Sequence, residues 1–173
     1  HRDRAEWSPF RDMVQPGATV VVKPNFVLDT SDPGLQHAVT THGSVIRPLI
    51  DYLWKAMEGQ GEIIIGDAPQ AEARFERICE RMGVTAMVDA LRQRGVNLRT
   101  LDFRKTKVVM KHGIWVGEQE NEQAQGRHLI VKLGRKSLFA ELSEQGRRLR
   151  GGGYSSHVTN HHHHGDVHDY CVS

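Results

Sequence analysis

The sequence is short of several residue types, and each shortage excludes a class of protein. Its 173 residues include only two cysteines and 6% aromatic residues. No apolar run approaches the roughly 20 residues that a membrane-spanning helix needs. The two cysteines, Cys79 and Cys171, lie far apart and form no CxxC pair, so neither a disulfide scaffold nor an iron–sulfur motif is indicated. We therefore expect a protein of a reducing compartment, the cytoplasm, with no membrane span.

An excess of one charge is also missing. Lys and Arg number 23 against 21 Asp and Glu, which leaves a net charge of +2 at pH 7. So small a net charge gives no general attraction to nucleic acid, and no specific nucleic-acid partner is expected. One local excess lies within residues 127–150, where seven basic residues stand against two acidic ones. This basic segment is either a solvated face or a docking surface for an acidic protein partner or for a homo-oligomer.

The order of the apolar patterns predicts a parallel βαβαβ core over residues 1–104. Three runs of β-branched and other apolar residues are typical of buried parallel strands and lie at 18–23, 62–66 and 96–103. Three stretches between them carry apolar residues at helical spacing, over 41–59, 71–82 and 84–91. Thr41 or Thr40 is placed to cap the first helix, and the residues before it are expected to form a loop. Cys79 lies on an apolar helical stripe and is expected in the core.

The second half has a different pattern, which predicts a β-rich elaboration over residues 105–173. Short strands are expected at 106–110, 113–116, 128–133 and 167–172, with a hydrophilic loop at 118–125. The fold class is therefore α/β: a three-layer, mainly parallel Rossmann-like sheet flanked by helices. We expect one domain over residues 1–173, truncated at its C-terminal end and closing on a histidine-rich segment.

Polar side chains follow each of the three predicted parallel strands and form the first candidate site. Ligands of open α/β sheets bind outside the carboxyl ends of the strands, where the first helix also begins. We assign catalytic roles there to Lys23, His42 and Asp67, and substrate-binding roles to Asn25, Thr41, Ser44 and Asp102. A cation, carboxylates, an imidazole and a helix N-terminus suit a small anionic or polar metabolite. The alternative is that these are ordinary polar residues of solvated loops.

The second candidate site is a cluster of histidines near the end of the chain. Imidazole is a common ligand of zinc, iron and nickel, and short histidine-rich tracts favour metal binding. The predicted ligands are His157, His161, His162, His164, Asp166 and His168. Their spacing matches no specific zinc motif, so solvated or hydrogen-bonding histidines are the alternative.

Four segments resemble a known family, the domain of unknown function 362. They are Val21–Val27, Thr41–Arg47 with Asp51 and Tyr52, Gly61–Pro69, and His162–Tyr170. The resemblance covers nearly the whole chain and implies a fold and a set of candidate positions. It implies that the family's His/Gly/His/Tyr motif falls on His164, Gly165, His168 and Tyr170. Some relatives carry ferredoxin-like iron–sulfur segments, which this sequence lacks, and members continue beyond the equivalent of Tyr170.

Two functions remain open at this point. The first is an enzyme that binds a small anionic or polar metabolite at the strand ends, with metal assistance from the terminal histidines. In it, Lys23 and Asn25 hold charge or a carbonyl, Asp67 orients a lysine or a metal, and His42 moves a proton. The alternative is a non-catalytic metal-binding or redox-partner docking module that uses the basic segment. A pocket joining Lys23, His42 and Asp67 would favour the enzyme.

Overall fold

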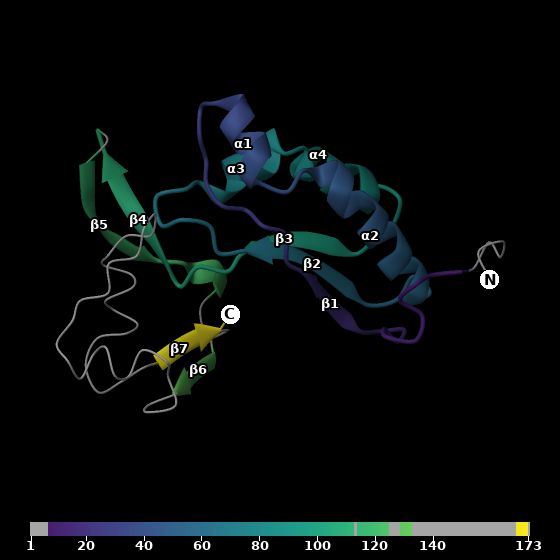
Figure 1. The fold of residues 1–173 in the computed structure, drawn as a ribbon. Helices are drawn as coiled ribbons and strands as arrows, with labels where there is room; N and C mark the ends of the chain where they lie inside the picture. Colours follow the sequence, from purple (N-terminus) through teal and green to yellow (C-terminus); the bar gives the residue numbers. More distant parts are fainter. Residues whose placement is uncertain (1–6, 113, 125–128, 133–168, 173) are drawn as a thin grey trace. The chain divides into compact units, whose positions relative to one another are not determined.

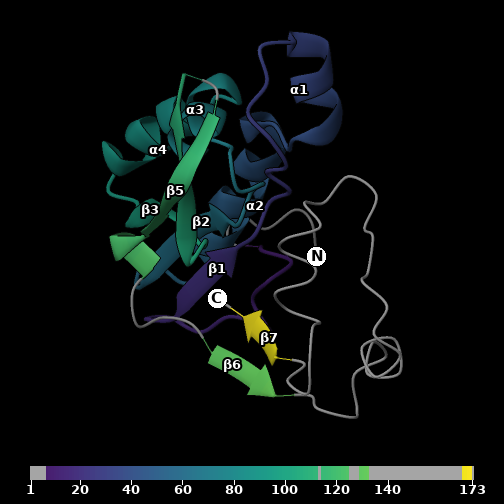
Figure 2. The same ribbon diagram turned by 90° about the vertical axis from the view of Figure 1, so that its left-hand side faces the viewer.

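The structure is a computed structural model that describes residues 7–112, 114–124, 129–132 and 169–172. Its chain divides into two compact units, residues 1–123 and residues 124–173, which are described separately. Figure 1 shows the elements of both units, and Figure 2 shows them after a quarter turn. No helix within the described ranges is long and apolar enough to cross a membrane.

A parallel three-stranded sheet forms the centre of the first unit. Strands β1 (Thr19–Val22), β2 (Glu62–Asp67) and β3 (Leu98–Asp102) lie in the order β1-β2-β3 (Figure 1). Both pairings are parallel, and Asp67 at the end of β2 pairs with Asp102 at the end of β3. The three strands predicted from the β-branched runs are thus confirmed, and their carboxyl ends meet at one edge of the sheet.

Helices flank this sheet, which confirms the predicted α/β class. Helix α2 (Gly43–Ala56) connects β1 to β2, and α3 (Phe75–Arg81) and α4 (Val84–Arg92) connect β2 to β3. The register of the β1–β2 and β2–β3 pairings places Val20, Ile63 and Leu98 on one face of the sheet, where they pack with the apolar sides of these helices. The core is built from fully buried aliphatic side chains of both layers, among them Ile46, Ile50, Ile63, Ile65 and Ile78.

The segment between β1 and α2 departs from the expected loop. It contains helix α1 (Pro33–Val39), whose N-cap Asp32 accepts hydrogen bonds from the backbone of Gly34 and Leu35. A capping aspartate followed by proline at the first helical position is a start signal that the sequence did contain. The cap of α2 also differs from the prediction: it is His42, whose ring accepts from the Ser44 N–H, and neither Thr40 nor Thr41.

The predicted change to β structure after residue 105 is confirmed. Strands β4 (Thr106–Lys111) and β5 (Ile114–Glu120) form an antiparallel pair with an irregularity between Val109 and Met110, and a short 3-10 helix, Glu122–Ala124, follows. Strand β5 continues to Glu120 and so includes residues 118–120, where the sequence predicts the start of a hydrophilic loop. In the second unit, β6 (Leu129–Lys132) pairs antiparallel with β7 (Asp169–Val172).

Candidate functional site

Two of the predicted site residues form an ion pair at the carboxyl ends of β1 and β2. The ammonium of Lys23 lies 2.7 Å from Oδ1 of Asp67. The Asp67 side chain is only 6% exposed, whereas that of Lys23 is 61% exposed. The Asp67 carboxylate therefore lies in the protein interior, and the Lys23 ammonium lies at the surface, where the strands end.

Asp67 is fixed by the backbone on either side of it. Its Oδ2 accepts a hydrogen bond from Phe26 N at 2.7 Å, and its Oδ1 accepts one from Ala68 N at 2.8 Å. The preceding residue must be glycine, because a Cβ on Gly66 would collide with the Leu101 carbonyl and the Phe103 ring. The Gly-Asp-Ala-Pro segment thus combines a close approach of two strands with a positioned carboxylate.

Asn25 and Thr41 are also brought together, mainly through their backbones. The N–H of Asn25 donates to Oγ1 of Thr41 at 3.0 Å, and the N–H of Thr41 donates to the carbonyl of Asn25 at 2.9 Å. The amide of Asn25 donates to the Val39 carbonyl at 3.3 Å. This pairing joins the end of β1 to the start of α2, so its first role is to close the intervening segment.

His42 and Ser44 form the beginning of α2. The Ser44 N–H donates to Nδ1 of His42 at 3.1 Å, so the neutral ring carries its proton on Nε2. The Gly43 N–H donates to the Met82 carbonyl at 2.8 Å. Both amides are used within the chain, so an anion at this helix start would have to be held by other donors. The rings of His37 and His42 lie with their centroids 5.7 Å apart.

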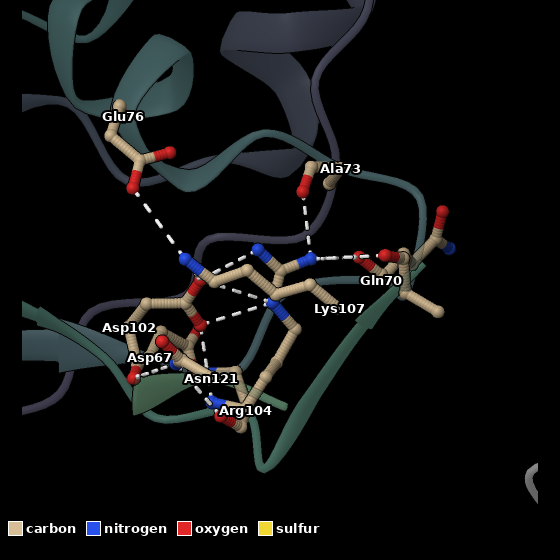
Figure 3. Close-up of polar contacts among 10 residues, drawn as sticks. Asp67, Gln70, Ala73, Glu76, Asp102, Arg104, Lys107 and Asn121 are labelled. Atoms are coloured by element: carbon tan, nitrogen blue, oxygen red, sulfur yellow. Dashed lines mark hydrogen bonds and ion pairs between the residues drawn. The ribbon is translucent and has the colours of Figure 1, made fainter. Parts of the chain in front are cut away.

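Asp102, at the end of β3, is placed differently from Lys23, Asn25 and Asp67 at the ends of β1 and β2. Its side chain is fully buried and is enclosed by the guanidinium of Arg104, with Arg104 Nη2 at 2.6 Å from Oδ2 (Figure 3). Lys107 adds a second cation 3.2 Å from the same oxygen. Arg104 and Lys107 enclose the carboxylate within the protein, so a ligand has no access to its oxygens. The geometry therefore does not support the substrate-binding role that the sequence predicts for Asp102.

The environment of Asp102 favours its ionised form. Burial raises the pKa of this carboxyl, but the hydrogen bonds and the charge of Arg104, together with the charge of Lys107, outweigh it. The pKa therefore lies below its ordinary value.

Arg104 links this carboxylate to a neighbouring loop, which sequence reasoning missed. Its Nη1 donates to the carbonyls of Gln70, Ala71 and Ala73, at 3.0, 3.1 and 2.7 Å (Figure 3). The buried amide of Asn121 donates to the carbonyls of Asp102 and Arg104. This cluster ties the end of β3, the loop after β2 and the end of β5 into one structure.

A second cluster that the sequence did not suggest surrounds Asp29, in the segment between β1 and α1. The Asp29 side chain is 4% exposed and faces three arginines, Arg74 before α3 and Arg77 and Arg81 within it. The only signal in the sequence was the spacing of these arginines along one helical face.

The cysteine and histidine predictions have different outcomes. Cys79 is buried in the core, as predicted, and burial raises the pKa of its thiol to about 12, with the charge of Glu76 adding to the effect. It is therefore not a thiolate nucleophile at neutral pH. The predicted metal ligands at positions 157, 161, 162, 164, 166 and 168 lie outside the described residues. Within the described part of the chain, no group of three or more His, Cys, Asp or Glu side chains is arranged to hold a metal ion.

Comparison with known proteins gives one match. The model of a family described as a domain of unknown function (DUF362) matches residues 20–122. This range contains all of β1 except Thr19, strands β2 to β5 and both clusters described above, and it ends before the closing segment His162–Tyr170. No curated protein and no solved structure matches the chain significantly.

Proposed function

The chain belongs to the DUF362 family, and from that premise we propose that it binds a small anionic or polar metabolite at the carboxyl ends of β1 and β2. Lys23 is the cationic group of this site, and Asp67 is the residue that positions it. The location agrees with the general rule that open parallel sheets bind ligands where their strands end.

One observation supports this proposal above the others: the cation is exposed although its carboxylate is buried. The Lys23 ammonium carries three N–H donors, and among the described residues its one ion-pair partner is Asp67, 2.7 Å away. The Lys23 side chain is 61% exposed, so its remaining donors are accessible to a ligand. A ligand oxygen arriving there would meet an ammonium that the ion pair with Asp67 keeps near the strand ends, which lowers the entropic cost of binding.

The same arrangement suits catalysis on the bound metabolite, and we include this in the proposal. An oriented ammonium stabilises negative charge that develops on a ligand oxygen. His42 follows the Thr41 that is paired with Asn25, and we assign proton transfer to this residue, as the sequence predicts. Metal assistance by zinc, iron or nickel at the terminal histidines and a location in the cytoplasm remain predictions from the sequence.

A binding screen with matched lysine variants tests the proposal. Pyruvate, malonate and citrate are titrated into wild-type protein, into Lys23→Ala and into Lys55→Ala by calorimetry. Lys55 is exposed near the other end of α2, so its replacement removes the same charge away from the strand ends. We expect at least one carboxylate to bind wild type and Lys55→Ala equally and Lys23→Ala about tenfold more weakly or not at all. Equal binding by all three proteins would refute the role of Lys23.

A further inference from the structure

We propose a second binding site, for the phosphate group of a small metabolite, at the arginines that surround Asp29. The site is formed by Arg74 and Arg77, with Arg81 and Asp29 as positioning residues. It does not depend on the function proposed for Lys23, because it uses none of the same side chains.

The geometry of the three arginines carries this inference. Nε of Arg74 lies 2.9 Å from Oδ2 of Asp29, and Nε of Arg77 lies 3.6 Å from Oδ1. Both side chains thus turn the Nε edge of the guanidinium toward the buried carboxylate. Among the described residues, the terminal nitrogens of Arg74 and Arg77 make no hydrogen bond. A guanidinium is a planar fork of N–H donors, and its terminal nitrogens can bind a phosphate through two parallel hydrogen bonds.

Arg81 has a different part in the cluster. Its Nη1 lies 3.2 Å from Oδ1 of Asp29 and also donates to the Thr30 carbonyl, and its side chain is 29% exposed. Of the three arginines it is therefore the one that, besides pairing with Asp29, attaches this segment to α3 through the Thr30 carbonyl. Arg74 and Arg77 are 64% and 39% exposed, so they remain accessible to a ligand.

The charge of the cluster is more positive than its structural role requires. One carboxylate faces three guanidinium groups, which leaves two positive charges in excess. The buried Asp102 carboxylate is paired with two cations, Arg104 and Lys107, so Asp29 is surrounded by one cation more than Asp102 is. The two surplus charges match a phosphate dianion, and Asp29 contacts Arg74 through a hydrogen bond and Arg77 through an ion pair.

The cluster lies at the same edge of the first unit as the Lys23 site. The Gln70 N–H donates to the Val27 carbonyl at 2.9 Å, which joins the segment carrying Asp29 to the loop that follows Asp67. Five residues separate Lys23 from Asp29, so their Cα atoms are at most about 22 Å apart.

The test is a phosphate titration followed by NMR on protein labelled with ¹⁵N. Inorganic phosphate is added at about pH 8 and constant ionic strength, with sodium chloride as the balancing salt, so that general screening does not change. We expect saturable shifts of the Nε–H signals of Arg74 and Arg77 and of the backbone amides of α3. Because this map uses the wild-type protein, it does not depend on any variant folding.

Two double variants then separate a site from general charge. Arg74→Ala with Arg77→Ala is expected to weaken phosphate binding by roughly tenfold or more. Arg92→Ala with Arg94→Ala removes the same charge from exposed positions at the end of α4 and is expected to leave binding unchanged. Arg74→Lys with Arg77→Lys keeps the charge but loses the fork, and should also bind more weakly. Absence of saturable shifts, shifts spread over all cationic residues, or equal loss in the Arg92 and Arg94 control would overturn the proposal.

Discussion

Asp67 and Asp102 occupy equivalent positions at the ends of neighbouring strands, yet Asp67 is paired with an exposed cation and Asp102 with a buried one. They end neighbouring parallel strands and are paired in register. Asp102 is enclosed by Arg104, whose side chain is 7% exposed, whereas Asp67 is paired with Lys23, whose side chain is 61% exposed. Both carboxylates are buried, so the difference lies in the cation and in how many of its donors remain available.

This difference separates a structural ion pair from a ligand site. Arg104 uses its whole guanidinium on Asp102 and on three loop carbonyls, so nothing is left for a ligand. A buried charge with all of its hydrogen bonds satisfied costs the most when one partner is removed. Lys23 has solvent around it, so its loss is expected to affect binding more than folding.

The largest effect is expected from Asp102→Asn. The substitution leaves Arg104 buried without its counterion, and we expect a loss of about 3–5 kcal/mol in the free energy of unfolding at pH 7. Urea unfolding followed by circular dichroism measures this loss. Asp12→Asn, at an exposed position, is the control and should change stability very little.

The difference in stability between wild type and Asp102→Asn is expected to depend on pH, and its sign follows from the pKa of Asp102. The pKa of Asp102 is lower in the folded state, so the stability that its charge contributes is complete above the unfolded-state pKa of about 3.9. It is lost as the pH falls through the lower folded-state pKa. The difference between wild type and Asp102→Asn should thus be constant from about pH 5 to 7 and shrink below about pH 4. A difference that grows on acidification would contradict this account.

Arg104→Lys should have the next largest effect. Lysine keeps the charge near Asp102 but cannot reach the carboxylate and the carbonyls of Gln70 and Ala73 together. We expect a loss of about 2–3 kcal/mol in the free energy of unfolding, because buried carbonyls lose their donor. Denaturant unfolding measures it, with Arg92→Lys as the exposed control. A loss as small as that of the control would mean that charge alone holds this cluster.

The sequence predicted the sheet better than the site because the two depend on different information. The β-branched runs before Lys23 and Asp67 are local, and they were sufficient to locate β1 and β2. The strand-end rule then placed Lys23 and Asp67 at one edge, where the structure pairs them. Asp102 follows the same rule, but Arg104 two residues later folds back over it, and a spacing of two carries no recognised signal.

The remaining differences also come from contacts between distant residues. Thr41 resembles a helix cap, but its hydroxyl accepts from the Asn25 N–H, which leaves His42 to cap α2. Asp29 resembles a loop aspartate, and only the packing of its segment against α3 brings it to Arg74 and Arg81. In both cases the partner lies more than ten residues away, so local patterns could not choose between a solvated and a paired side chain.

Asp67→Asn is expected to cost less than either change in the Asp102 cluster. An asparagine oxygen can still accept from one of the two backbone donors, Phe26 N or Ala68 N, and Lys23 can turn to solvent. We expect a loss of about 1–2 kcal/mol in the free energy of unfolding, which corresponds to one weakened buried hydrogen bond. Thermal and urea unfolding measure it. A loss equal to that of Asp102→Asn would remove the distinction between the two aspartates.

The smallest effect is expected for the coupling between Lys23 and Asp67. A double-mutant cycle with Lys23→Ala and Asp67→Asn isolates this pair from the backbone contacts that Asp67 also makes. Because solvent surrounds the lysine, the coupling free energy should be at most about 1 kcal/mol, the range of exposed ion pairs. Unfolding of the four proteins in urea measures it. A coupling of several kcal/mol would show that Lys23 is held for stability, and the exposed ammonium would then be a counterion with no free role toward a ligand.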